Sequence, residues 1–154
     1  MLATDDYSAT LASRGQGFGP EELAYVRSRL RDGSLDCTVV QQATTLWHRI
    51  VDARALTAQL ARLVELNRYE NVSIGVIPED TAFAFVPPET DFTMIDDKRV
   101  LVPLLSDVWH FTTNSELALY RREMAACVEA AAFDGSAVQE IAGAIAEAAK
   151  HYSS

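Results

Sequence analysis

The sequence is poor in cysteine, has no long apolar run and carries no basic excess. Its 154 residues include only Cys37 and Cys127, too few for a disulfide framework, and a chain of this length does not need one. No run of about 18 apolar residues occurs, which excludes a membrane-spanning helix. The first ten residues have neither the basic nor the apolar region of a signal peptide. These absences predict a protein of the reducing cytoplasm that makes no membrane contact.

Acidic residues outnumber basic ones, 22 against 13, and the formal net charge is −9. An acidic surface repels phosphate groups, which argues against direct nucleic-acid contact by this segment. The densest basic cluster is "RSRLR" at 27–31, and acidic residues flank it on both sides. We therefore expect the partner of this segment to be a protein or a small molecule.

The spacing of apolar residues predicts an α+β fold. Helices are expected at 5–13, 20–31, 52–66, 113–133 and 136–150, with a short helical turn near 43–51. Strands are expected at 35–42, 72–77, 91–96 and 99–105. Because the helices lie between and after the strands, we expect one layered domain over residues 1–154. It would hold a small mixed sheet of about four strands, packed with helices and followed by two C-terminal helices.

Local signals mark several boundaries of these elements. Asp52 is a predicted N-cap. Thr113 with Glu116 and Ser136 with Gln139 have the spacing of capping boxes. The sequence Asp-Asp-Lys at 96–98 predicts a tight turn that joins the last two strands into a hairpin.

Two tryptophan–histidine steps are the first candidates for a ligand pocket. They are Trp47-His48 in "LWHRI" and Trp109-His110 in "VWHFT". Indole rings can stack on a flat ligand, and imidazoles can bind its polar groups. The alternative interpretation makes the tryptophans core or interface anchors and the histidines rim residues, and the sequence leaves both open.

Paired carboxylates give a second candidate, Glu79-Asp80, directly after the strand expected at 72–77. In open α/β sheets, ligands bind beyond the carboxyl ends of strands. The charge of Asp36 is expected to raise the pKa of the Cys37 thiol, which argues against a reactive thiolate. No metal-binding or nucleophile motif occurs. We therefore predict no metal, no cofactor and no catalytic residues, and the sequence favours a role other than catalysis.

Several segments occur in an order that resembles a known family. They are "MLATDDYSA", "PEELAYVRSRLR", "TVVQQATTLW", the Gln59-Leu60-x-x-Leu63 pattern, "NVSIGVIP" and "FTMIDDKRVLVPL". Together they resemble the actinobacterial domain of unknown function that follows the helix-turn-helix of Cro/repressor-type regulators. These regulators belong to the xenobiotic-response-element family and are antitoxin-like. The resemblance covers nearly the whole chain.

The resemblance implies a ligand-sensing or protein-interaction domain of a transcriptional regulator, often encoded beside a small acidic partner protein. The DNA-binding helix-turn-helix would precede Leu2 and is absent from this chain. The chain departs from the family pattern at 41–43, "QQA", and in "VPLLSD", where the family commonly has acids. The alternative is a free-standing small enzyme or binding protein that uses histidine acid–base chemistry in an aromatic pocket. Self-association as a homodimer is expected in either case.

Overall fold

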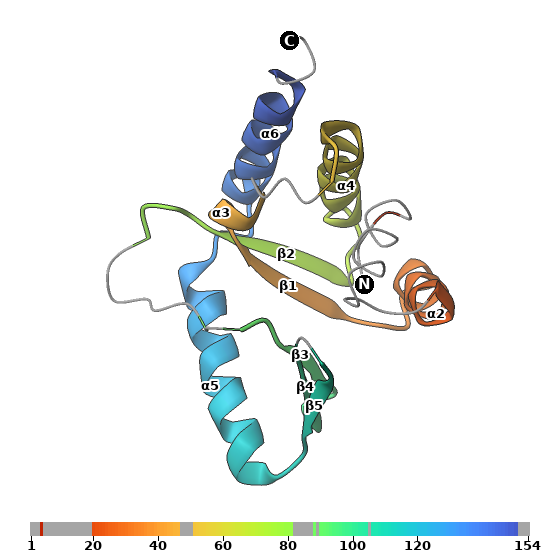
Figure 1. The fold of residues 1–154 in the computed structure, drawn as a ribbon, viewed down its shortest axis with the longest axis vertical. Coiled ribbons are helices and arrows are strands. Elements are labelled where there is room, and N and C mark those ends of the chain that lie inside the picture. Colours follow the sequence, from red (N-terminus) through yellow and green to blue (C-terminus); the bar gives the residue numbers. More distant parts are fainter. Residues whose placement is uncertain are drawn as a thin grey trace. The chain divides into compact units, whose positions relative to one another are not determined.

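The fold of this computed structural model is α+β, as the sequence predicted, with two C-terminal helices. The structure describes residue 4 and residues 20–46, 51–81, 88, 90–104 and 106–150. The helix predicted at 5–13 lies outside these residues. The elements are α2 (Pro20–Arg31), β1 (Cys37–Gln42), α3 (Ala43–Leu46), α4 (Ala53–Leu66), β2 (Val72–Ile77), β3 (Thr93–Ile95), β4 (Arg99–Pro103), β5 (Val108–Phe111), α5 (Asn114–Ala130) and α6 (Gly135–Lys150) (Figure 1).

The chain divides into two compact units. Unit 1 comprises Met1–Glu79 and Ala131–Ser154, and unit 2 comprises Asp80–Ala130. The strands form a parallel pair, β1-β2, and an antiparallel sheet in the order β3-β4-β5, instead of the one mixed sheet we expected. The difference arises because each sheet packs its own helices around its own core. That the whole chain acts as a single domain stays a prediction.

β1 and β2 form the parallel strand pair of unit 1. β1 and β2 run in register from Cys37 opposite Val72 to Gln42 opposite Ile77. On the other side of β2, the N–H of Val76 donates to the carbonyl of Ala132, and the reverse bond also forms, both at 2.9 Å. β2 therefore has hydrogen-bonded neighbours on both edges, and its last four residues are buried, as in the strands of parallel sheets.

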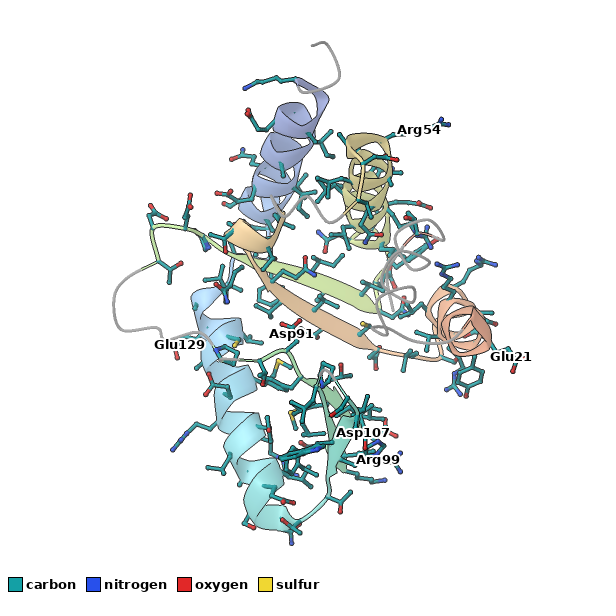
Figure 2. The ribbon with its side chains drawn as sticks, in the orientation of Figure 1. Glu21, Arg54, Asp91, Arg99, Asp107 and Glu129 are labelled. Carbon is teal, nitrogen blue, oxygen red and sulfur yellow. The ribbon has the colours of Figure 1, made fainter. Side chains whose placement is uncertain are left out.

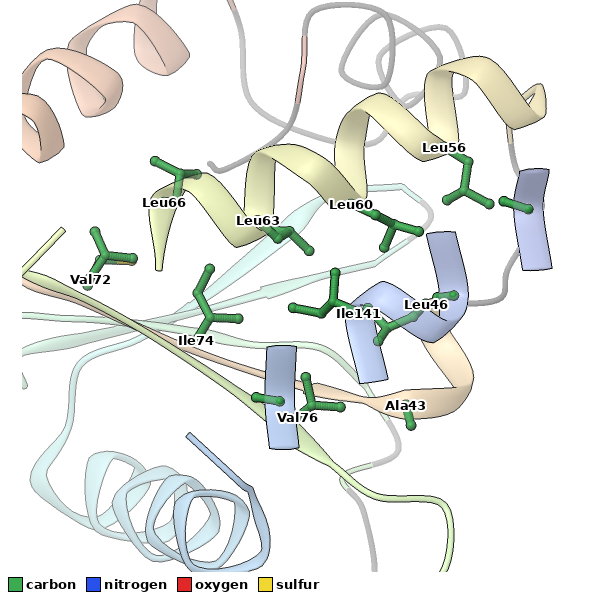
Figure 3. Close-up of a cluster of buried hydrophobic side chains, with 14 of the residues drawn as sticks. Ala43, Leu46, Leu56, Leu60, Leu63, Leu66, Val72, Ile74, Val76 and Ile141 are labelled. Atoms are coloured by element: carbon green, nitrogen blue, oxygen red, sulfur yellow. The ribbon is translucent and has the colours of Figure 1, made fainter. Parts of the chain in front are cut away.

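The core of unit 1 lies between α4, α6 and β2. Leucines spaced one and two helical turns apart on α4 point toward β2 and α6 (Figure 3). Leu60 is 2% exposed, and Ile74 of β2 and Ile141 of α6 are each 1% exposed. Asp52 caps α4 as predicted, since its Oδ1 accepts a hydrogen bond of 2.8 Å from the N–H of Ala55. The backbone N–H of Thr4 donates to Oε1 of the buried Gln59 at 2.6 Å.

Asn71 joins the end of α2 to the start of β2. Its Nδ2 donates to the carbonyl oxygens of Leu30 at 2.9 Å and Leu35 at 2.7 Å. Leu30 lies in the last turn of α2, where carbonyls lack partners within the helix. The asparagine of the "NVSIGVIP" motif thus has a structural role that an apolar strand pattern does not reveal.

We expect Asn71→Ala to lower the free energy of unfolding by about 1–2 kcal/mol, because two partly buried hydrogen bonds are lost. Asn71→Asp, nearly identical in shape, should lower the free energy of unfolding further at neutral pH, since a carboxylate would face two carbonyl oxygens. Urea denaturation followed by circular dichroism measures both changes. The exposed neighbour Glu70 provides the control: if Glu70→Ala costs as much as Asn71→Ala, the assigned role is wrong.

The hairpin in unit 2 forms where the sequence predicted it. β3 and β4 pair antiparallel, and the N–H of Lys98 donates to the carbonyl of Ile95 at 3.0 Å. Asp96 and Asp97 have φ values of 50° and 58°, as a type I′ turn requires of its two central residues. Arg121 of α5 holds this turn, because its Nε donates to Oδ1 of Asp97 at 2.6 Å.

The predicted capping box at the start of α5 is confirmed. Glu116 Oε2 accepts hydrogen bonds from the backbone N–H of Thr113 at 3.1 Å and from its hydroxyl at 2.6 Å. These bonds hold the pKa of the Glu116 carboxyl below its usual range. Because the folded-state pKa is lowered, this contribution to stability is present at neutral pH and is lost as the pH falls through the lowered pKa.

Three features of the C-terminal half differ from the prediction. α5 ends at Ala130 and not near Phe133, because the backbone of Ala132 pairs with β2. The second predicted capping box is wrong: α6 begins before Ser136, and Oδ1 of Asp134 accepts a bond of 2.8 Å from the Ser136 N–H. The four-residue strand β5 was not predicted.

Candidate functional site

The two faces of the sheet in unit 2 differ in what covers them. Residues opposite each other in the β4–β5 ladder share a face, and successive residues alternate between faces. The inward face, which includes Val100 and Val102, packs against Leu117 of α5. The other face, here called the outward face, carries Thr93, Ile95, Arg99, Leu101, Pro103, Val108 and His110. Figure 2 shows Arg99 projecting from the sheet on the side away from α5.

A row of four aromatic rings lies on the inward side of this sheet. Phe92 and Tyr120 have ring centroids 5.1 Å apart, and Tyr120 and Phe111 have theirs 5.4 Å apart. Trp109 completes the row, with its ring edge-on to Phe111 at 6.3 Å. Trp109 is nonetheless 57% exposed, so the row runs from the small core of unit 2 to solvent.

The outward face carries more apolar side chains than is usual for a face turned to solvent, beside the polar Thr93, Arg99 and His110. Ile95 is 41% exposed and Val108 is 43% exposed, and Leu101 lies half-buried between the two strands that carry them. An antiparallel sheet with one face on a core normally alternates apolar and polar residues, with the polar ones outward. The sequence contains a signal for this feature: "VLVPL" at 100–104 is apolar at every position, which indicates a strand with two apolar faces.

The structure places the predicted ligand-binding residues as follows. Trp109 and His110 are both exposed, but they are neighbours on β5 and point to opposite faces of the sheet. Glu79 and Asp80 are exposed after the end of β2, and the division between the two units falls between them. Trp47 and His48 lie outside the described residues. That the two tryptophan–histidine steps line a ligand pocket, and that a ligand binds at Glu79-Asp80, both stay predictions.

The cysteines and acids offer no reactive or metal-binding arrangement in the described part of the chain. Cys37 and Cys127 are buried, and burial raises the pKa of both thiols; for Cys127 the charge of Glu123 adds to this. The predicted direction for Cys37 is confirmed, although burial, and not Asp36, is the cause. Among the described residues, no group of three or more His, Cys, Asp or Glu side chains could hold a metal ion.

The chain is thus an α+β protein whose antiparallel sheet exposes Ile95 and Val108 on its outward face. Residues 1–142 match the model of the family described as "Domain of unknown function (DUF5753)", and the chain belongs to this family. No curated protein and no solved structure matches it. Across the described residues, no helix has the length and apolar character needed to cross a membrane.

Proposed function

We propose that this chain is a protein-interaction domain of a transcriptional regulator and does not itself bind DNA. The observation that carries the proposal is the outward face of unit 2, where Ile95 and Val108 are exposed and Leu101 lies half-buried between their strands. Exposed apolar side chains that gather on one face are typical of interaction sites. Sites for small molecules are concave, whereas an open sheet face suits a second protein surface. This favours protein interaction over ligand sensing.

The charge and the motif order support the regulator part of the proposal. A net charge of −9 opposes contact with nucleic acid, so DNA binding would belong to another segment of the regulator. The resemblance described above supports a Cro/repressor-type, antitoxin-like regulator of an actinobacterial cytoplasm. The small acidic protein encoded beside such regulators is the proposed partner. Since both proteins are acidic, apolar contacts have to supply most of the affinity.

The outward face is tested by Ile95→Lys, with Leu119→Lys as the matched control. Leu119 is 58% exposed on α5, also in unit 2, so both variants add one charge at an exposed apolar residue. We expect Ile95→Lys to weaken binding of the neighbouring gene product at least about tenfold in calorimetry, because the lysine would be desolvated within the interface. Leu119→Lys should bind like the wild type. Equal affinities for all three proteins would refute the role of this face.

The regulator part is tested separately by gel shift with DNA from upstream of the gene. We expect the protein read from the complete reading frame to bind a specific fragment, and residues 1–154 alone not to bind it. Tight, specific DNA binding by residues 1–154 would overturn the proposal. Binding of the partner by a chain whose complete frame encodes no DNA-binding segment would support interaction but refute the regulator role.

A further inference from the structure

β5 is an edge strand whose outer backbone groups can be identified. The N–H of Leu104 donates to the carbonyl of Asp107 at 2.8 Å, so these two residues form a hydrogen-bonded pair at the start of the β4–β5 ladder. Hydrogen-bonded and non-hydrogen-bonded pairs alternate along an antiparallel ladder. The backbone N–H and carbonyl groups of Trp109 and Phe111 therefore form hydrogen bonds with β4. Those of Val108 and His110 point away from β4.

Two further observations agree with this assignment. Pro103, which has no N–H, lies opposite Val108, where the ladder needs no donor from it. The N–H of Val108 donates at 2.7 Å to Oδ1 of Asp107 and not to β4. The N–H and the carbonyl of His110 thus face the free edge of the sheet.

Apart from its short length, this edge lacks the usual protection against pairing with another strand. Natural proteins protect exposed edges with short strands, lysine, proline, inward charges or bulges. β5 has the sequence Val-Trp-His-Phe, without lysine, proline or an acidic residue, and two of its apolar side chains, Val108 and Trp109, are exposed. Asp107 shields only the first N–H of the strand.

We propose that β5 pairs antiparallel with β5 of a second copy of this chain, with the two-fold axis at His110. In this register the N–H and carbonyl of each His110 bond to those of the other, which forms a complete ring of two hydrogen bonds. The register centred on Trp109 is worse. It would place the carbonyl oxygen of His110 against the Val108 N–H, which the Asp107 carboxylate already occupies.

The side chains also fit the register centred on His110. Trp109 would lie opposite Phe111 of the second copy in a non-hydrogen-bonded pair, where Cα atoms approach to about 4.5 Å. Cross-strand aromatic pairs of this kind stabilise sheets. The aromatic row, which ends at the exposed Trp109, would continue into the aromatic row of the second copy. The pairing uses the edge of the sheet and leaves Ile95 exposed, so it does not depend on the proposed function.

The strength of association tests the pairing first. A four-residue edge buries little area, as in weak interfaces below about 1,200 Å². We therefore expect the intact chain to dimerise with a dissociation constant between roughly 10 µM and 1 mM. Sedimentation equilibrium should show reversible dimers for the wild type and for His110→Ala, which keeps its N–H. His110→Pro should be monomeric, because it removes only the outward donor and leaves the bonds to β4 intact. A wild type that stays monomeric up to about 1 mM would overturn the proposal.

Disulfide trapping tests the register and does not require the proline variant to fold. In His110→Cys the two copies would place cysteine Cα atoms about 5.5 Å apart, within the range of about 4.4–6.8 Å found in disulfides. Val108→Cys is the matched control, since it lies on the same face of the same strand, but its two copies would be about 14 Å apart. We expect mild oxidation to give covalent dimers of His110→Cys only. Equal dimer yields, or dimers of Val108→Cys alone, would refute the pairing, and so would a dimeric His110→Pro.

Discussion

Gly75→Ala is expected to destabilise unit 1 by about 3 kcal/mol, the upper end of the usual cost of overpacking. A Cβ at this residue would lie 2.6, 2.8 and 2.9 Å from three carbons of the Phe133 ring. Carbon atoms do not approach so closely, so the ring or β2 has to move. The free energy of unfolding from urea titration measures the cost.

A double-mutant cycle with Phe133 shows whether the ring is the cause. Phe133→Ala removes the ring and creates room for a Cβ at residue 75. In that background, Gly75→Ala should lower the free energy of unfolding by at least about 1 kcal/mol less than it does in the wild type. Gly143→Ala is a control for the loss of a glycine, since nothing lies within 4 Å of a Cβ there. It should be neutral or stabilising, because alanine favours the helix α6. If the cost of Gly75→Ala is unchanged without the Phe133 ring, the clash is not its source.

Leu60→Ala is expected to lower the stability of unit 1 by about 2–5 kcal/mol, the range for large-to-small substitutions in closed cores. Leu60 is 2% exposed and lies in the core that includes Ile74 of β2 and Ile141 of α6. Removal of its side chain leaves a cavity in the core between α4, β2 and α6, which cannot collapse freely. The β2 amides should exchange hydrogen faster in this variant, which measures the loss of stability in unit 1 directly.

The matched control for this substitution is Leu119→Ala, the same chemical change at a leucine that is 58% exposed. It should change stability by no more than about 0.5 kcal/mol. If the two variants were equally stable, α4 would not pack on β2 as the structure has it.

Local chemistry explains why much of the fold could be predicted. The N-cap at Asp52, the capping box at Thr113 and the hairpin turn at 96–98 involve residues within a few places of one another. Their hydrogen bonds depend on short spacing, so the sequence alone displays them. The spacing of leucines on α4 and the limits of β2 at Val72 and Ile77 were predicted for the same reason.

The features that were missed depend on residues far apart in the chain. α5 ends early because Ala132 bonds to Val76, more than fifty residues away. β5 has only four residues, and its strand conformation comes from its ladder with β4. The role of Asn71 depends on carbonyls of Leu30 and Leu35, which no local pattern connects to it.

By itself, the sequence determined the class of fold, the acidic character of the chain and the caps and turns that delimit most elements. Only the tertiary structure decided that the strands form two sheets and that Trp109 and His110 face opposite ways. It also decided that Ile95 and Val108 on the outward face of unit 2 are exposed. The physical reason is that propensity and capping act between neighbours in the chain. Which apolar face meets a core, and which is left to solvent, is decided by packing between distant segments.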